Sequence, residues 1–72
     1  MKNLHYIVVK DTGKTKVWEV VSNHNNVVLG KIGWYPQWRR YVFFPFSNML
    51  FDSTCLNEIQ KFINSQMVLR RT

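Results

Sequence analysis

The apolar pattern of this 72-residue chain changes period once, and that change constrains the fold more than any single motif. The first two thirds hold short segments of β-branched and aromatic residues, separated by turn-forming residues. From residue 53 the apolar side chains recur at helical spacing instead. The sequence therefore predicts strands followed by one helix. We expect a single domain over residues 1–72, because a chain of this length rarely forms two.

Turn-forming residues separate four predicted strands, at residues 4–10, 15–22, 27–34 and 39–44. Asp and Gly occur together at 11–14, asparagines occur at 23–26, and Pro36 marks the third break. Loops this short connect neighbouring strands in antiparallel fashion. We therefore expect a three- or four-stranded antiparallel meander over about residues 4–46.

Charge suggests the register of the two central strands. If Glu19 lies opposite Lys31, the pair stabilises the sheet by roughly 0.2–1 kcal/mol. One face then carries four apolar side chains, Trp18, Val20, Ile32 and Trp34. The opposite face carries Val17, Val21, Leu29, Tyr35 and aromatic residues of the fourth strand. A face this apolar is expected to be a binding or self-association surface.

The predicted helix covers about residues 53–66. At 100° per residue, five apolar side chains fall within an arc of about 120°. They are Cys55, Leu56, Ile59, Phe62 and Ile63. Residues 52–54 are successive candidates for the N-cap. Gln66 and Val68 break the pattern, so residues 67–72 are expected either to form a frayed tail or to contact something else. The predicted fold class is α+β in the order ββββα, with the helix covering one face of the sheet.

The chain is basic, with ten Lys and Arg against four Asp and Glu and a formal net charge of +6. Residues 34–41 concentrate two Trp, two Tyr and two Arg around a turn. Trp34 and Tyr41 either belong to the core or join an exposed group, whereas turn residues are expected to be exposed. Arginines beside flat rings suit both nucleic acids and protein partners. The predicted binding residues are Lys14, Lys16, Lys31, Tyr35, Trp38, Arg39 and Arg40.

The chain ends in a dibasic pair, Arg70 and Arg71. Mobile cations at a chain end are expected to be solvated, and they could add phosphate contacts. Together with the lysines near the first turn, they support a positively charged surface whose binding to phosphate weakens as salt rises.

No catalytic or metal-binding site is predicted. Cys55 falls inside the apolar arc of the helix and is expected to be a small core residue. His5 and His24 share no zinc-ligand spacing with it. The four carboxylates leave no acid–base pair. Asp11 is explained by a turn and Glu19 by a cross-strand pair, whereas Asp52 is expected to cap the helix and Glu58 to lie on its solvent side. We therefore predict a protein that is not an enzyme, with no cofactor and no metal.

A single cysteine cannot form an intrachain disulfide, which favours a reducing compartment. No apolar run approaches the roughly 20 residues that span a bilayer, and the N-terminus does not resemble a secretory signal. We expect a cytoplasmic protein with no membrane partner, in the host cytoplasm if it is viral.

Four stretches carry a resemblance: VWEV at 17–20, GKIGW at 30–34, WRRYVFFP at 38–45 and CLNEI at 55–59. They resemble small orphan proteins encoded by phages and mobile elements. The resemblance implies an accessory protein that acts on host defence or on nucleic acid, anti-CRISPR proteins included. Many anti-CRISPR proteins are acidic DNA mimics, and a net charge of +6 departs from that pattern. The predicted architecture alone is similar to integrase arm-type and AP2-type DNA-binding domains, whose sheet enters the major groove.

Two functional hypotheses follow from these residues. The first is a non-enzymatic module that binds the phosphate backbone of nucleic acid through a basic, aromatic sheet face. The second is a phage or mobile-element accessory protein that occludes a host defence protein or ribonucleoprotein complex, with Tyr35, Trp38 and Arg39 as anchors. A homodimer through the uncovered sheet face is a further alternative.

Overall fold

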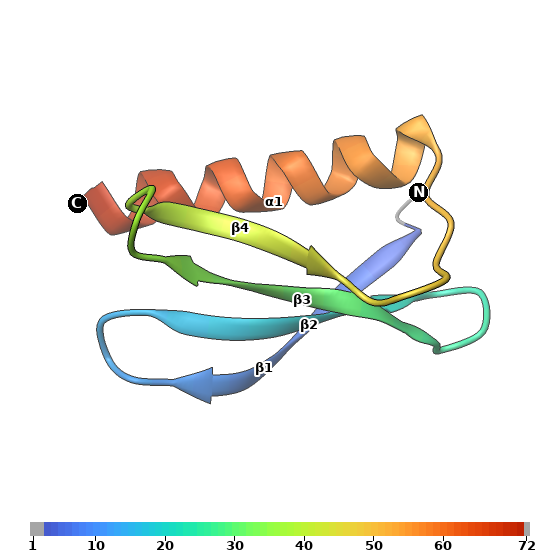
Figure 1. The fold of residues 1–72 in the computed structure, drawn as a ribbon, viewed down its shortest axis with the longest axis horizontal. Helices are drawn as coiled ribbons and strands as arrows, with labels where there is room; N and C mark the ends of the chain where they lie inside the picture. Colours follow the sequence, from blue (N-terminus) through green and yellow to red (C-terminus); the bar gives the residue numbers. More distant parts are fainter. Residues whose placement is uncertain (1–2, 72) are drawn as a thin grey trace.

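A computed structural model describes residues 3–71 and shows one sheet covered on one face by one helix (Figure 1). The elements are β1 (Leu4–Asp11), β2 (Lys16–Ser22), β3 (Val28–Tyr35), β4 (Arg40–Pro45) and α1 (Ser53–Arg71). The strands lie in the order β1-β2-β3-β4, and each neighbouring pair is antiparallel. The predicted ββββα fold is confirmed, with all four strands in one sheet.

The predicted register of the central strands is also confirmed. Glu19 pairs with Lys31, Trp18 with Ile32, and Val20 with Gly30. Gly30 is required by its surroundings. A Cβ atom there would lie 2.5 Å from the backbone oxygen of Phe44 and 2.7 Å from the ring of Phe43. No larger residue fits that position without moving β4.

The core lies between the sheet and α1. Successive strand side chains point to opposite faces, so only every second residue of a strand reaches the helix. The buried core residues are Leu4, Trp18, Val20, Ile32, Tyr41 and Ile59. The ring of Trp18 lies edge-on to Tyr41, with centroids 5.2 Å apart, and to Phe62 at 5.0 Å. These edge-to-face contacts join β2, β4 and α1.

Two irregularities interrupt the strand pairing. Between Val20 and Val21 the register with β3 shifts, so Leu29 is an extra residue on β3. Leu29 packs against the helix-side core, and its predicted place on the opposite face is wrong. A second shift occurs between Val8 and Lys10 in β1. A bulge of this kind disrupts the ladder and bends the strand.

The helix is longer than the sequence predicts. Its N-cap is Asp52, whose Oδ1 accepts a hydrogen bond from the backbone N–H of Cys55 at 2.9 Å. The predicted end of the helix, near residue 66, is wrong, because α1 continues to Arg71. Met67 packs against the core, and this contact stabilises the additional helical turn beyond residue 66. The predicted frayed tail is therefore helical through Arg71, and Thr72 lies outside the described residues.

Candidate functional site

The turn between β3 and β4 presents the most exposed aromatic ring near the predicted site. The backbone N–H of Trp38 donates to the carbonyl of Tyr35, and that of Arg39 donates to the carbonyl of Pro36, both at 3.2 Å. Arg39 has a φ of 52°, in the left-handed region that few residues other than glycine adopt. These bonds close a tight loop whose tip points away from the core.

Trp38 and Tyr35 form an aromatic pair on this turn. Their ring centroids lie 4.9 Å apart, at an interplanar angle of 72°. Trp38 is 64% exposed, whereas Tyr35 is partly covered. Arg40 supports the turn, because its Nε donates to the carbonyl of Trp38 at 3.3 Å. The turn thus carries an indole that is mostly exposed to solvent and two arginines that are its neighbours in the sequence.

The turn between β1 and β2 carries the second group of cations. Oδ1 of Asp11 accepts a hydrogen bond from the N–H of Gly13 at 2.8 Å, and Gly13 has a φ of 86°. Lys16 lies 4.0 Å from Asp11 as a half-exposed ion pair. Lys14 follows the glycine and is exposed. The turn therefore carries two lysines and one carboxylate. The charge of Lys16 is already paired with that of Asp11, which leaves Lys14 as the unbalanced positive charge.

Arg70, near the end of α1, connects the first turn to β3. Its Nη1 donates to the backbone carbonyl of Lys14 at 2.7 Å. Its guanidinium lies 4.0 Å above the ring of Trp34 as a cation–π contact. Arg70 remains exposed, as expected, but these two contacts hold its side chain, so it does not belong to a mobile tail. The side chain of Arg71 lies outside the described part of the structure.

Three elements thus bring their cations to one end of the molecule (Figure 1). The turn between β1 and β2, the turn between β3 and β4, and the C-terminal end of α1 all lie at this end. We call it the basic end, and its residues are Lys14, Lys16, Arg39, Arg40 and Arg70. A hollow of about 300 Å³ lies between the first turn and the helix and is lined in part by Lys14, Lys16 and Arg70.

The basic end corrects the predicted basic sheet face. Lys31 is separate from it, in the middle of β3 and directly opposite Glu19. The topology explains the difference, because in a meander the first and third turns always lie at the same end of the sheet. A helix that begins after β4 and runs back along the sheet ends there too. The sequence contained this signal, since the cations occur in the first turn, the third turn and the chain end.

Trp34 and Tyr41 belong to the core side. Tyr41 is buried, and its hydroxyl accepts a hydrogen bond from the backbone N–H of Lys16 at 3.3 Å. Trp34 packs edge-on against Tyr41, with centroids 5.3 Å apart, beneath Arg70. Of the two alternatives for these rings, the core assignment is confirmed. The exposed part of the aromatic run is Trp38 with its arginines.

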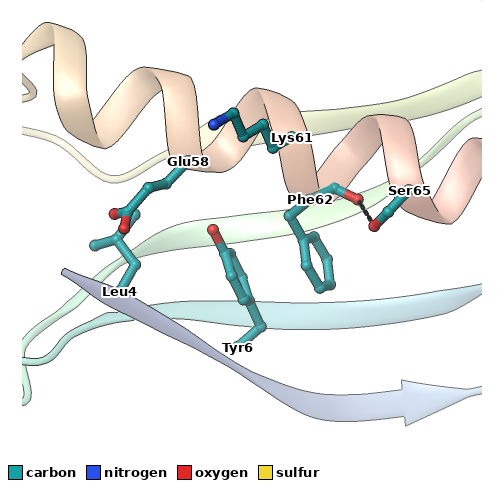
Figure 2. Close-up of a pocket in the computed structure, with 6 residues that line it drawn as sticks. All are labelled: Leu4, Tyr6, Glu58, Lys61, Phe62 and Ser65. Atoms are coloured by element: carbon teal, nitrogen blue, oxygen red, sulfur yellow. Dashed lines mark hydrogen bonds between the residues drawn. The ribbon is translucent and has the colours of Figure 1, made fainter. Parts of the chain in front are cut away.

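A second hollow, of about 360 Å³, lies between β1 and α1 (Figure 2). Tyr6 stacks on Phe62 there, with centroids 3.9 Å apart and planes 13° from parallel. Glu58 points toward the same space, and its Oε1 accepts a hydrogen bond from the N–H of Asn3 at 2.9 Å. The predicted place of Glu58 on the solvent side of the helix is wrong, because this carboxylate is half-buried.

Two buried polar atoms in that hollow have no hydrogen-bond partner among residues 3–71, namely the hydroxyl of Tyr6 and Oε2 of Glu58. Burial, followed by the nearby charge of Glu58, raises the pKa of Tyr6 to about 12. The phenol therefore stays protonated at physiological pH. Both atoms are shielded from solvent, so the hollow offers a ligand mainly the apolar parts of its lining.

Cys55 is half-buried at the first turn of α1 and packs against the core, as predicted. Burial, and then the hydrogen bond and charge of Asp52, raise the pKa of its thiol. A raised pKa keeps the thiol protonated, which lowers its reactivity as a nucleophile. Within the described part of the chain, no three His, Cys, Asp or Glu side chains gather as a cation site requires.

None of the helical residues that the structure describes forms a segment both long and apolar enough to cross a bilayer.

Comparison with known proteins places this chain in a family. The chain is 38% identical over 69 residues to the protein described as "Uncharacterized 9.3 kDa protein" of Acholeplasma phage L2, covering 94% of this chain and 88% of the phage protein. The chain belongs to this phage protein's family. The resemblance to small phage-encoded proteins is thereby confirmed. No protein-family model and no solved structure matches the chain.

The predicted binding residues and the basic end have four cations in common. Lys14 and Lys16 lie at the first turn, and Arg39 and Arg40 lie at the third. Both turns lie at the same end of the sheet (Figure 1), and Tyr35 lies beside Trp38. Arg70 was missing from the predicted site, because the tail was expected to be frayed and not helical. Its position three residues beyond Met67, on one face of a continuing helix, is the signal that could have included it.

Proposed function

We propose that this phage-family protein is a non-enzymatic module that binds nucleic acid through its basic end, within the cytoplasm of the infected cell. The observation that supports this most is the convergence of five cations from three separate elements. Of the four acidic residues, only Asp11 lies at the basic end. Glu19 lies in β2, Glu58 lies in the N-terminal half of α1, and Asp52 caps the start of that helix. The resulting charge asymmetry attracts a polyanion to one end and orients it there.

The exposed ring supports the choice of nucleic acid among polyanions. Phosphates need cations, whereas unstacked bases need flat apolar surfaces. Trp38 offers such a surface next to Arg39 and Arg40, and stacking of one base contributes about 1–3 kcal/mol. The basic end therefore supplies both kinds of contact within one turn.

The salt dependence of oligonucleotide binding tests the proposal. Each phosphate contact adds nearly one unit to the slope of log K against log salt on duplex DNA, and somewhat less on single strands. Arg39→Ala combined with Arg40→Ala should reduce that slope by about two units. Lys61→Ala is the matched control, because Lys61 is an exposed cation in the middle of α1 and outside the basic end. Binding that ignores salt, or an equal loss of slope in the control, would refute the proposal.

A second candidate is an accessory protein that occludes a host protein, an anti-CRISPR role included. The exposure of Trp38 favours it, because Trp and Arg concentrate binding energy at protein interfaces. The two candidates separate in pull-downs with and without nuclease. A complex with one host protein that survives nuclease and is lost in Trp38→Ala would favour occlusion over nucleic-acid binding.

A further inference from the structure

The sheet face opposite α1 is left uncovered by the helix (Figure 1). Side-chain alternation defines it, because Tyr6, Ile32 and Tyr41 point toward the helix and their strand neighbours point away. We call this surface the open face. Its residues include Ile7, Val17, Glu19, Val21, Lys31, Val42 and Phe44. Val21 is buried there although it belongs to no part of the helix-side cluster, so the open face has a small apolar centre of its own.

One row of paired residues crosses all four strands of the open face. Ile7 pairs with Glu19, Glu19 pairs with Lys31, and Lys31 pairs with Phe44. The row therefore reads apolar, acidic, basic, apolar from β1 to β4. Ile7 and Phe44 are each 45% exposed. Although Glu19 and Lys31 are directly opposite, they form no ion pair with each other in the part of the chain that the structure describes.

The row is complementary to a copy of itself. A twofold axis that runs along the strands, between β2 and β3, places β1 over the partner's β4 and β2 over the partner's β3. Ile7 then meets the partner's Phe44, and Glu19 meets the partner's Lys31. Each contact occurs twice, as a twofold interface requires. We propose that the open face binds a second copy of this chain, forming a face-to-face dimer with these two contacts at its centre.

An interface of standard size buries roughly 800 Å² on each partner. Two sheets packed in this way keep their strand directions within about 30° of each other.

The dimer stands apart from the proposed function, because its central contacts use Ile7, Glu19, Lys31 and Phe44, whereas Arg40 is the one basic-end residue that alternation places at the border of the open face. It does affect that function, since a twofold axis along the strands places both basic ends at the same end of the dimer. The two clusters then repel each other, and this repulsion weakens as salt rises. Dimerisation should therefore strengthen with salt, whereas nucleic-acid binding should weaken.

Charge reversal tests the proposal. Sedimentation equilibrium over low to high micromolar concentrations should show a reversible dimer for the wild type. Glu19→Lys and Lys31→Glu should each weaken dimerisation by at least about tenfold, because each places like charges in both central contacts. Circular dichroism of each variant checks that the monomer remains folded, since either change also puts like charges opposite each other within one sheet.

Mixing the two variants gives the decisive result. Within each protomer the like charges remain, but between a Glu19→Lys chain and a Lys31→Glu chain both central contacts become attractive again. A heterodimer, identified by native mass spectrometry with one chain isotopically labelled, is the expected outcome. A wild type that stays monomeric at every concentration would overturn the proposal. A dimer that ignores both reversals, or two folded variants that fail to combine, would overturn it equally.

Discussion

Replacing Arg39 by glycine should give a more stable protein than replacing it by alanine, although both changes remove the same charge. The reason is the backbone φ of 52° at this position. A left-handed conformation costs a residue with a Cβ atom about 1–2 kcal/mol, and glycine avoids this cost. Glycine loses about 0.5–1 kcal/mol more than alanine in conformational entropy on folding. Taken at the middle of each range, the net difference is about 0.75 kcal/mol in favour of the glycine variant.

Thermal unfolding followed by circular dichroism measures this difference. In a domain of this size, about 0.75 kcal/mol corresponds to a rise of roughly 3–6 °C in Tm. Arg39→Asn should fall between the other two variants, because asparagine tolerates the left-handed region better than alanine does. An alanine variant as stable as the glycine variant would show that the turn does not hold residue 39 at positive φ.

The same two variants separate folding from binding. Both lack the guanidinium, so both should reduce the salt slope of oligonucleotide binding by about one unit, whatever their Tm. If the slope instead follows Tm, the effect of Arg39 on binding is a consequence of stability. If the slope is equal in both, the arginine acts through its charge at a strained, exposed position.

Two further changes test other contacts. Tyr6→Phe removes a buried hydroxyl that lacks a partner among the described residues, so unfolding by urea at neutral pH should show no loss of stability. The wild type should lose stability as pH rises from 10 toward 12, because the phenol of Tyr6 ionises at lower pH in the unfolded chain than in the folded one. Tyr6→Phe should lose less stability over the same range. Equal pH profiles for the two proteins would contradict the raised pKa of Tyr6. Arg70→Ala removes the 2.7 Å bond to Lys14 and the stack on Trp34, so the last turn of α1 should fray and far-UV ellipticity should fall by more than in Arg70→Lys. Unchanged ellipticity in Arg70→Ala would show that these contacts do not order the helix end.

The strand order and register were predictable because local signals agreed with one another. Turn residues at 11–14 and 23–26 leave no length for a crossover, so neighbouring strands must be antiparallel. The pair of Glu19 and Lys31 then selects one register, and every side chain of β2 and β3 follows from it up to the bulge. Leu29 lies beyond that point. Its inward position depends on an extra residue that no periodic pattern indicates.

The end of the helix was not predictable from the helix alone. Gln66 and Val68 violate the apolar arc, and on an isolated helix that violation predicts fraying. In the folded protein, Met67 reaches the core and Arg70 bonds the carbonyl of Lys14. These partners come from β3, β4 and the first turn, so tertiary contacts extend α1 where its own pattern fails. The same contacts add Arg70 to the basic end.

The bulge in β1 has a consequence for the protein at high concentration. β1 is an edge strand, and Ile7, Val8 and Val9 expose apolar side chains beside unpaired backbone groups. Such an edge is a template for fibril growth, in which further chains add strand by strand. The interruption between Val8 and Lys10 spoils the even spacing that an incoming strand would need, and Lys10 adds a charge beside it. The extra residue in β1 thus disfavours the addition of further chains to this exposed apolar edge.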